Sequence, residues 1–330
     1  MRLIGFVIAA CAMAASASAQ QFTMKLSSPT INDVTQEWMK AFKTGVETRS
    51  GGKVKIEIYP ASQLGPIPRT VEGVALGTIE MTLPATGFLA ALEPRFVVFD
   101  APGLFDSMQH AERVFADAEV AKRLASFGAT KGVEPLITFA HGPLMLLAHR
   151  PIRGVADFKG QKLRVPGGAP MHIEPFRKLG ASPVSIPLGE VMPAMQNHTI
   201  DGFIGGLTVF TSFKYYDVAK GLTRLPGSHL IAAGLVNRNF MKSLGPDLER
   251  IVREEARKAE PLFATWGAED VERGKKLWAQ NGGENIEMPP AEAKRYLDET
   301  TSVLPGLLGA NPQLKEDYEA LVAAARRNRQ

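Results

Sequence analysis

The sequence predicts an α/β fold of two lobes that are braced by one long helix. Strand and helix patterns alternate from residue 22 onward, and the same rhythm resumes beyond a turn at Arg150-Pro151 and a loop that ends at Gly160. A helical pattern then continues over about 247–280. We therefore expect lobe I to comprise 20–141 plus 230–265, and lobe II to comprise 142–229 plus 266–330.

The first lobe begins with a strand, a helix and a second strand. Phe22, Met24 and Leu26 alternate with polar residues, as in a strand with one buried face. Apolar residues at helical spacing follow over 34–46 until Gly51-Gly52, and alternation returns over 54–58. Further segments are expected as a helix at 70–76, a strand at 79–83, a helix at 107–128, and extended segments at 135–140 and 144–148.

The second lobe repeats this alternation, with expected strands at 163–165, 183–186 and 200–204 and expected helices at 169–179 and 190–196. A strand at 230–236 precedes the long helix of about 247–280, which Pro261 should kink. At ~1.5 Å per residue this helix approaches roughly 50 Å, longer than one small domain is wide, so it should brace both lobes. Helices at 291–304 and 313–326 close the chain.

Residues 1–19 have the pattern of a secretory signal peptide. Arg2 precedes a short apolar run, and Ala17-Ser18-Ala19 provides a small-x-small cleavage site. Cleavage after Ala19 predicts export to the periplasm and leaves a mature chain of 330 − 19 = 311 residues without cysteine. Disulfides and thiolate chemistry are then excluded. An alternative interpretation, in which Cys11 is the acylated anchor of a lipoprotein, stays open.

The charge and the motifs argue against several classes of protein. The 38 basic and 34 acidic residues are intermixed, which gives no indication of a nucleic-acid partner. No later stretch resembles a membrane-spanning helix of ~20 apolar residues, so we expect no direct membrane insertion. Nucleophile-elbow, phosphate-loop, dinucleotide and zinc-protease motifs are absent, and the six histidines lack zinc-type spacing. We therefore predict no catalytic residues, no metal, no cofactor and no enzymatic activity.

Two features at expected strand ends are candidates for a binding site. Arg164 lies in a short apolar strand and precedes Pro166-Gly167-Gly168, so its planar guanidinium is placed to bind a carboxylate through two hydrogen bonds. Asp201-Gly202 opens a segment that ends at Gly206, where glycine admits a ligand or another backbone. Composition by itself favours an ordinary surface arginine at 164, and the spacing of the glycines is equally compatible with a plain tight turn.

An ordered series of motifs resembles the DctP-type solute-binding proteins of TRAP transporters. The series consists of Tyr59-Pro60, Gln63-Leu64-Gly65, Glu72, Gly77, Ile79-Glu80-Met81, Gly160, Lys162, Arg164-Val165, Leu179-Gly180-Ala181, Pro183-Val184, Glu190, Gln196 and Asp201-Gly202. The likeness extends from the first strand through the long helix. It implies a bilobal periplasmic-binding-protein fold, in which two α/β domains are joined by crossing hinge strands and a long interdomain helix.

The resemblance also implies a function. Proteins of this family close on a small organic acid between the lobes and deliver it to TRAP membrane subunits, which use an ion gradient rather than ATP. We accordingly expect a periplasmic carboxylate-binding protein that traps its ligand by lobe closure, and we expect a monomer. Two alternatives are a binding protein of an ABC importer and, from another class, a secreted hydrolase or isomerase with Glu72 or Glu190 as its base.

Candidate site residues follow from the matched motifs. In the family, the arginine that matches Arg164 forms a salt bridge with the ligand carboxylate. Gln63 and Glu72 match positions near the cleft, although Gln63 is also placed to shape a turn and Glu72 to cap or pair within its own helix. The aromatic residues that we expect to enclose the ligand body are Phe88, Phe203, Phe210 and Phe213.

Two departures from the family pattern predict the class of ligand. Leu144 stands where many relatives carry a second arginine, and Ile204-Gly205-Gly206 stands where many carry Glu-Asn-Pro. Both replace polar partners by apolar surface or space. Because unpaired buried polar groups are costly, a sugar acid or a dicarboxylate would be poorly served. We therefore predict a monocarboxylate with a bulky or apolar body, such as an aromatic or branched keto or hydroxy acid, with Leu144 and Gly205 at the site.

Overall fold

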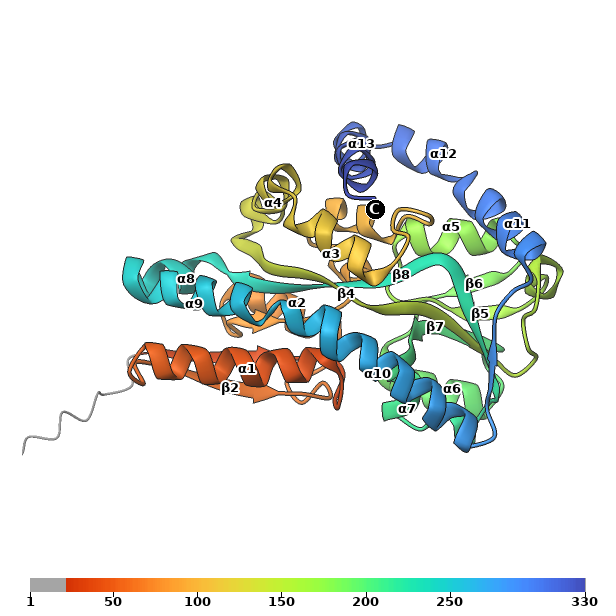
Figure 1. Ribbon diagram of the computed structural model, residues 1–330, viewed down its shortest axis with the longest axis horizontal. Helices are drawn as coiled ribbons and strands as arrows, with labels where there is room; N and C mark the ends of the chain where they lie inside the picture. The colour runs from red at the N-terminus through yellow and green to blue at the C-terminus, as the bar shows by residue number, and fades with distance from the viewer. Residues whose placement is uncertain (1–21, 330) are drawn as a thin grey trace, which may run out of the picture.

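The computed structural model describes residues 22–329, which form a mixed α/β molecule (Figure 1). The predicted signal peptide, its cleavage site after Ala19 and the alternative anchor Cys11 lie outside the described residues. Within the described range, none of the helices combines the length and the apolarity needed to cross a bilayer.

In the described part of the chain, nine strands form one sheet. Its order is β2-β1-β3-β8-β4-β7-β5-β6, and β9 pairs with β8 beside this path. At one end β1 is parallel to β2 and β3, and at the other end β5 is parallel to β6 and β7. The strands are β1 (Phe22–Ser27), β2 (Val54–Tyr59), β3 (Met81–Thr82), β4 (Val133–Ala148), β5 (Lys162–Arg164), β6 (Ser182–Val184), β7 (Gly202–Gly206), β8 (Gly221–Asn237) and β9 (Glu284–Ile286).

The long antiparallel strands β4 and β8 connect these two groups of parallel strands. Val236 of β8 pairs with Met81 of β3, whereas Leu144 of β4 pairs with Gly206 of β7. The ladder between β4 and β8 is interrupted by three register shifts. Register shifts of this kind bend strands, so β4 and β8 pass from one lobe into the other as crossing strands.

The sequence predicted shorter strands in the regions of β4 and β8, and the predicted strand lengths were wrong. The expected segments 135–140 and 144–148 are parts of the single strand β4, and the expected strand 230–236 is one end of β8. Gly142-Pro143 and Pro226-Gly227 interrupt the local apolar pattern. The two strands nevertheless remain paired because the register shifts absorb the additional residues.

Helices cover the sheet, with α11, α12 and α13 arching over the top of the view and α1 at its lower left (Figure 1). The expected helix at 107–128 is two helices, because Asp117 ends α3 and caps α4 by accepting a hydrogen bond from the Glu119 N–H. The helices are α1 (Val34–Arg49), α2 (Ile67–Leu76), α3 (Met108–Ala116), α4 (Ala118–Leu124), α5 (Pro170–Lys178), α6 (Leu188–Gln196), α7 (Leu207–Ser212), α8 (Arg238–Ser243), α9 (Gly245–Ala259), α10 (Pro261–Gln280), α11 (Pro290–Thr301), α12 (Leu304–Gly309) and α13 (Pro312–Arg327), and the 3-10 turns used below are η1 (Thr86–Leu89), η2 (Pro94–Asp100) and η5 (Tyr215–Asp217).

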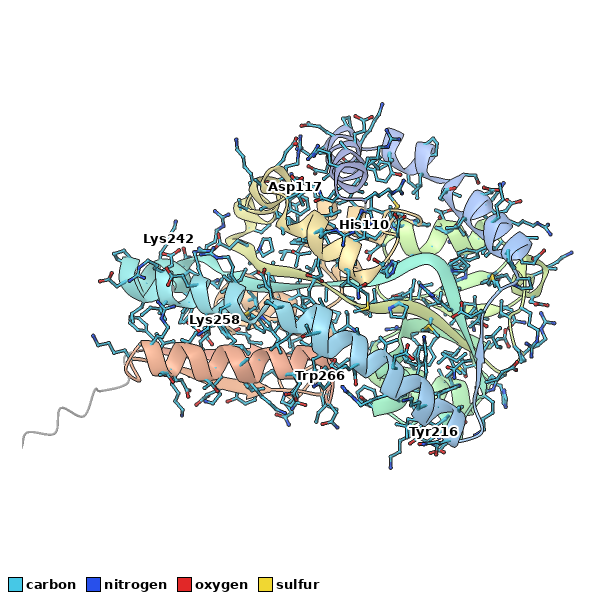
Figure 2. The ribbon with its side chains drawn as sticks, viewed as in Figure 1. His110, Asp117, Tyr216, Lys242, Lys258 and Trp266 are labelled. Carbon is cyan, nitrogen blue, oxygen red and sulfur yellow. The ribbon has the colours of Figure 1, made fainter. Side chains whose placement is uncertain are left out.

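The predicted long helix is present as two helices placed end to end. α9 ends at Ala259 and α10 begins at Pro261, whose ring and missing N–H interrupt the hydrogen-bond ladder, so the predicted interruption is confirmed. Lys258 and Trp266 mark the two sides of the break in Figure 2. α10 contacts both α1 and α7 and therefore joins elements from the two ends of the sheet. The residue boundaries of the two lobes stay predictions.

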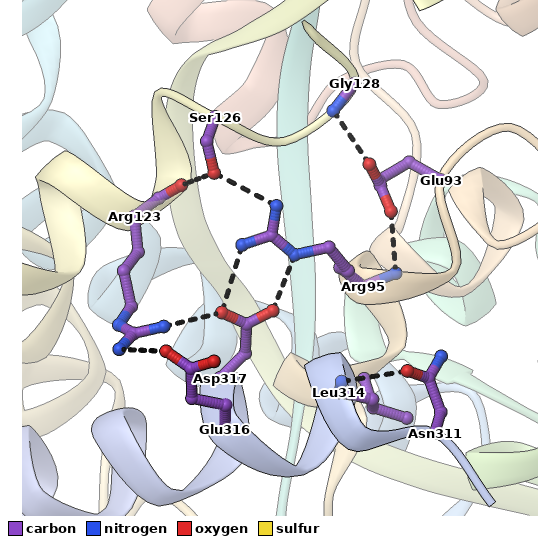
Figure 3. Close-up of polar contacts among 9 residues, drawn as sticks. All are labelled: Glu93, Arg95, Arg123, Ser126, Gly128, Asn311, Leu314, Glu316 and Asp317. Atoms are coloured by element: carbon purple, nitrogen blue, oxygen red, sulfur yellow. Dashed lines mark hydrogen bonds and ion pairs between the residues drawn. The ribbon is translucent and has the colours of Figure 1, made fainter. Parts of the chain in front are cut away.

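The C-terminal helix is fastened by an ionic network (Figure 3). Asp317 of α13 is 1% exposed and accepts hydrogen bonds from Arg95 Nε at 2.6 Å and Arg95 Nη2 at 3.0 Å. Arg123 Nη1 donates to the same carboxylate at 3.1 Å. Arg95 lies in η2, so the network fixes α13 to this turn. η2 follows η1, which forms part of one wall of the cleft described below.

Candidate functional site

A large cleft opens between segments from the two predicted lobes. Its volume is about 1430 Å³. One wall comes from the β2–α2 connection, α2 and η1, and the other comes from the β5–α5 loop, the β6–α6 connection and η5. A second, small cavity of about 50 Å³ adjoins it, because both are lined by Pro29, Ile67, Phe88 and Leu188. The two cavities together form the candidate site.

Arg164 lines the small cavity from the end of β5 and is only 2% exposed. Its Nε donates a hydrogen bond to the Ile186 carbonyl oxygen at 3.1 Å, whereas its buried Nη2 has no partner. Within residues 22–329, no carboxylate forms an ion pair with this guanidinium. A buried cation without a counter-ion is costly, so the site is electrostatically suited to an anion.

Two aromatic side chains accompany Arg164. Phe88 of η1 lines both cavities, and its ring centre lies 5.8 Å from the Arg164 guanidinium carbon. Tyr215 of η5 is buried and lines the large cleft. Burial lowers the pKa of Arg164 to about 10, which leaves the guanidinium charged at neutral pH. Burial raises the pKa of Tyr215 to about 12, with Arg164 acting in the opposite direction.

A histidine–aspartate pair holds the loop after Arg164 against the opposite wall. His172 Nδ1 donates to the Pro166 carbonyl oxygen at 2.7 Å, and His172 Nε2 lies 3.5 Å from Asp100 Oδ1. Asp100 also accepts a hydrogen bond from the Thr86 hydroxyl at 2.9 Å. Burial opposes protonation of His172, but the Asp100 charge and these hydrogen bonds raise its pKa overall. The pair therefore links α5 to η1 and η2.

A second buried pair joins His141, which lines the small cavity, to Asp33 behind it. His141 of β4 donates through Nε2 to Asp33 Oδ2 at 2.9 Å, and the Thr30 hydroxyl and the Gln36 N–H donate to the same carboxylate. Burial acts to raise the pKa of Asp33, but the hydrogen bond and the charge of His141 lower it overall. His141 Nδ1 is buried without a partner.

The comparisons with known proteins identify the family. Residues 27–306 match the sequence profile of bacterial extracellular solute-binding proteins, family 7 (DctP). The chain belongs to this family. The 2,3-diketo-L-gulonate-binding periplasmic protein of Escherichia coli is 28% identical over 235 residues, 71% of each chain. A TRAP periplasmic solute-binding protein from Desulfovibrio salexigens with bound orotic acid superposes with a TM-score of 0.88 at 23% identity, covering 93% of this chain and 99% of that one. A TRAP periplasmic solute-binding protein from Shewanella oneidensis with bound succinate superposes with a TM-score of 0.85 at 26% identity, covering 92% of this chain and 99% of that one.

Membership in the solute-binding family confirms several expectations. The bilobal periplasmic-binding fold and the DctP-type resemblance are confirmed. Members of the family are periplasmic proteins that bind small organic acids and work with TRAP membrane components, and they are not enzymes. This decides against an ABC-importer protein and against a hydrolase or isomerase with Glu72 or Glu190 as base.

In residues 22–329 no three His, Cys, Asp or Glu side chains are grouped to hold a metal ion.

The predicted site residues of this solute-binding protein lie at different depths. Phe88, Phe203 and Gly205 line the small cavity together with Arg164. Glu72 has an exposed side chain that lines the large cleft, as does the half-buried Phe213. The remaining candidates line neither cavity: Gln63 is exposed, Leu144 is buried between strands, and Phe210 packs in the core against Phe203 and Trp278.

Sequence reasoning missed Tyr215, His141 and Asp33. Asp33 caps α1, a role that gives no sign of a binding site. The partner of this cap, His141, is 108 residues away in the chain, and no local pattern links the two. Tyr215 follows α7, a helix that the sequence did not predict, so its approach to the cleft had no local signal.

Proposed function

We propose that this solute-binding protein captures a monocarboxylate with a bulky, largely apolar body and hands it to TRAP membrane subunits. The observation that carries the proposal is the buried, unpaired guanidinium of Arg164 in a cavity lined mostly by apolar side chains. The ligand carboxylate replaces the missing counter-ion and takes the free Nη2 donor. Since an isolated buried charge is unfavourable, much of the binding free energy comes from this neutralisation.

The small number of cations around the cleft favours a ligand with one carboxylate over a ligand with two. Among the described residues that line the two cavities, Arg164 is the sole lysine or arginine. The large cleft contributes two carboxylates of its own, Glu72 and Glu190. A second carboxylate on the ligand would meet negative charge there, which disfavours binding.

The residues that line the small cavity favour a ligand with an apolar body. Phe88, Leu188 and Phe203 surround the space beside Arg164, with Gly205 leaving room where a side chain would stand. Its additional apolar lining consists of Pro29, Ile67, Leu83, Ala85, Pro166, Ile204, Val209, Leu230 and Ala232. Flat or branched hydrocarbon groups fit such walls, whereas a sugar acid would leave several hydroxyl groups without partners. Orotate, which is bound in the Desulfovibrio salexigens protein, is also a monocarboxylate on a flat ring, with polar N–H and carbonyl groups on that ring.

Capture requires closure of the cleft. Small-molecule sites commonly measure roughly 300–1000 Å³, and the large cleft exceeds this range at about 1430 Å³. We propose that β4 and β8 act as the hinge and that rotation of the lobes narrows the large cleft around a ligand held by Arg164. The closed form is then the one that the membrane subunits recognise.

Calorimetric titration with a matched panel tests the proposal. Phenylacetate and 4-methyl-2-oxopentanoate represent the predicted class, and succinate and a sialic acid represent the excluded classes. We expect binding of at least one of the first pair and loss of that binding in Arg164→Gln. Native mass spectrometry of freshly purified protein provides an independent search for a co-purified acid. Binding of succinate or the sialic acid alone would refute the monocarboxylate class.

A further inference from the structure

We propose that His141 is a second ligand-binding residue, which selects a hydroxyl group remote from the ligand carboxylate. The inference rests on the proposed function and deepens it. It narrows the ligand to a carboxylic acid with a distal hydroxyl group, such as a phenol at the far end of an aromatic acid.

Unpartnered polar atoms point to this residue. In the described part of the chain, eight buried side-chain nitrogen or oxygen atoms lack a hydrogen-bond partner. Of the residues that carry them, Arg164 and His141 line the candidate site, and both line the same small cavity. Since buried polar groups are nearly always paired, two open groups in one cavity indicate two polar groups on one occupant.

Asp33 fixes the imidazole so that Nδ1 is the available atom. The Asp33 carboxylate accepts the Nε2–H of His141 and is itself held by the Thr30 hydroxyl and by the Gln36 N–H of the first turn of α1. This arrangement leaves His141 Nδ1 free to bond elsewhere. Gly206 lies beside that nitrogen, because a Cβ on Gly206 would stand 3.1 Å from it.

Arg164 and His141 bind different parts of a ligand. Arg164 and Leu147 are both register partners of Phe203, so β5 and β4 flank β7. Adjacent strands are ~4.8 Å apart, which places β4 and β5 roughly 10 Å from each other. His141 lies further along β4, beyond Leu144. A carboxylate docked on Arg164 therefore leaves His141 to another group of the same molecule.

The charges around His141 favour a hydroxyl at this second position. A hydroxyl can donate to a neutral Nδ1 and can accept from a protonated one, so it satisfies either state of the ring. A second carboxylate would lie near Asp33 and Asp270, whose carboxylates both interact with this imidazole, and Arg273 pairs with Asp270 from an exposed position. Repulsion between these negative charges and a second ligand carboxylate disfavours a dicarboxylate.

Three ligands that share one carbon skeleton test the inference by calorimetry: phenylacetate, 4-hydroxyphenylacetate and 4-carboxyphenylacetate. In the wild-type protein we expect 4-hydroxyphenylacetate to bind about ten-fold more tightly than phenylacetate, the size of one well-placed hydrogen bond. We expect 4-carboxyphenylacetate to bind more weakly than either.

Two variants prevent a ligand hydroxyl from bonding to His141 Nδ1 and still leave Asp33 with a hydrogen-bond donor. His141→Gln retains a side-chain N–H that can reach Asp33, but its amide oxygen does not occupy the position of Nδ1. Gly206→Ala retains His141 and places a methyl group against Nδ1, at a backbone φ of −77° that alanine adopts freely. In both, the ratio of the two dissociation constants should fall towards one. Thr138→Val is the matched control, because Thr138 also has an unpartnered buried hydroxyl in β4 but does not line the site.

The outcomes separate this inference from the proposed function. Binding of phenylacetate that requires Arg164 but gains nothing from the hydroxyl, or a wild-type ratio in both variants, overturns the role of His141 alone. Tight binding of 4-carboxyphenylacetate overturns the choice of hydroxyl. Failure of all three ligands, with another ligand bound independently of Arg164, overturns the proposed function together with this inference. Melting temperatures of each variant show that the protein is folded.

Discussion

The guanidinium carbon of Arg164 lies 5.8 Å from the centre of the Phe88 ring, across the candidate site. Arg164 belongs to β5 and Phe88 to η1, so the contact joins the two walls of the cleft. The face of an aromatic ring attracts a cation only weakly compared with a carboxylate. The contact therefore holds the guanidinium in place while leaving its charge available for a ligand.

Replacement of Arg164 should have opposite effects on binding and on stability. Arg164→Gln removes the charge that pairs with the ligand and should weaken binding by about 2–5 kcal/mol. It also removes a buried cation without a counter-ion, so the ligand-free variant should melt at a higher temperature than the wild type. Calorimetry and thermal denaturation measure the two effects. A lower melting temperature without ligand would contradict the electrostatic account.

Gly167 should be essential for the close approach of the two walls, and its neighbour Gly168 should not. A Cβ on Gly167 would stand 2.6 Å from the Gly87 carbonyl oxygen, and the φ of Gly167 is +68°. Gly167→Ala should therefore separate the β5–α5 loop from η1, lower the melting temperature and weaken ligand binding by about ten-fold or more. Gly168→Ala is the control, because no atom beyond its chain neighbours lies within 4 Å of its added Cβ. Equal behaviour of the two variants would show that the close approach is unimportant.

Glu112 should make stability fall as pH rises. Burial raises its pKa to about 8; a hydrogen bond from the Ala140 N–H opposes this, and the charge of Glu260 adds to it. The folded-state pKa thus exceeds the ordinary value of about 4.3, so the associated stability is complete below that value and is lost as pH rises towards 8. Glu112→Gln retains an oxygen that can accept from Ala140 but cannot ionise. Its advantage over the wild type should grow from about pH 5 to pH 8 and then level off, on the order of a few kcal/mol.

Urea denaturation at pH 5, 7 and 9 measures this difference. Glu287→Gln, at an exposed position, is the control and should stay within about 0.5 kcal/mol of the wild type throughout. A constant offset for Glu112→Gln across this range would mean that the carboxyl group ionises as readily in the folded protein as in the unfolded chain.

Asp317 should be necessary for docking of the C-terminal helix. Asp317→Ala leaves Arg95 and Arg123 without their shared buried carboxylate, and such a loss costs about 3–5 kcal/mol. The adjacent Glu316 pairs with Arg123 at 3.0 Å but is 63% exposed, so Glu316→Ala should cost about 1 kcal/mol at most. Hydrogen exchange should show increased opening of α13 only in the Asp317 variant. Comparable losses in both variants would rule out a special role for burial.

Local sequence patterns predicted most elements of this fold because each pattern reports which face of one element is buried. The α/β alternation, the interruption at Pro261 and the strand-end position of Arg164 are all properties of short segments. The patterns failed at β4 and β8, where Gly142-Pro143 and Pro226-Gly227 interrupt an alternation that pairing across the sheet restores. They also failed at 107–128, where Asp117 ends one helix and begins the next.

The sequence by itself therefore determined the α/β class, the family resemblance and one cation at a strand end beside glycine. Only the tertiary structure decided that this cation is buried and unpaired, that Tyr215 approaches it, and that His141 reaches Asp33 across 108 residues. The physical reason is that the desolvation of a side chain and its bonding partners depend on which distant strands and helices pack around it. The periodicity of a short segment contains no information about that packing.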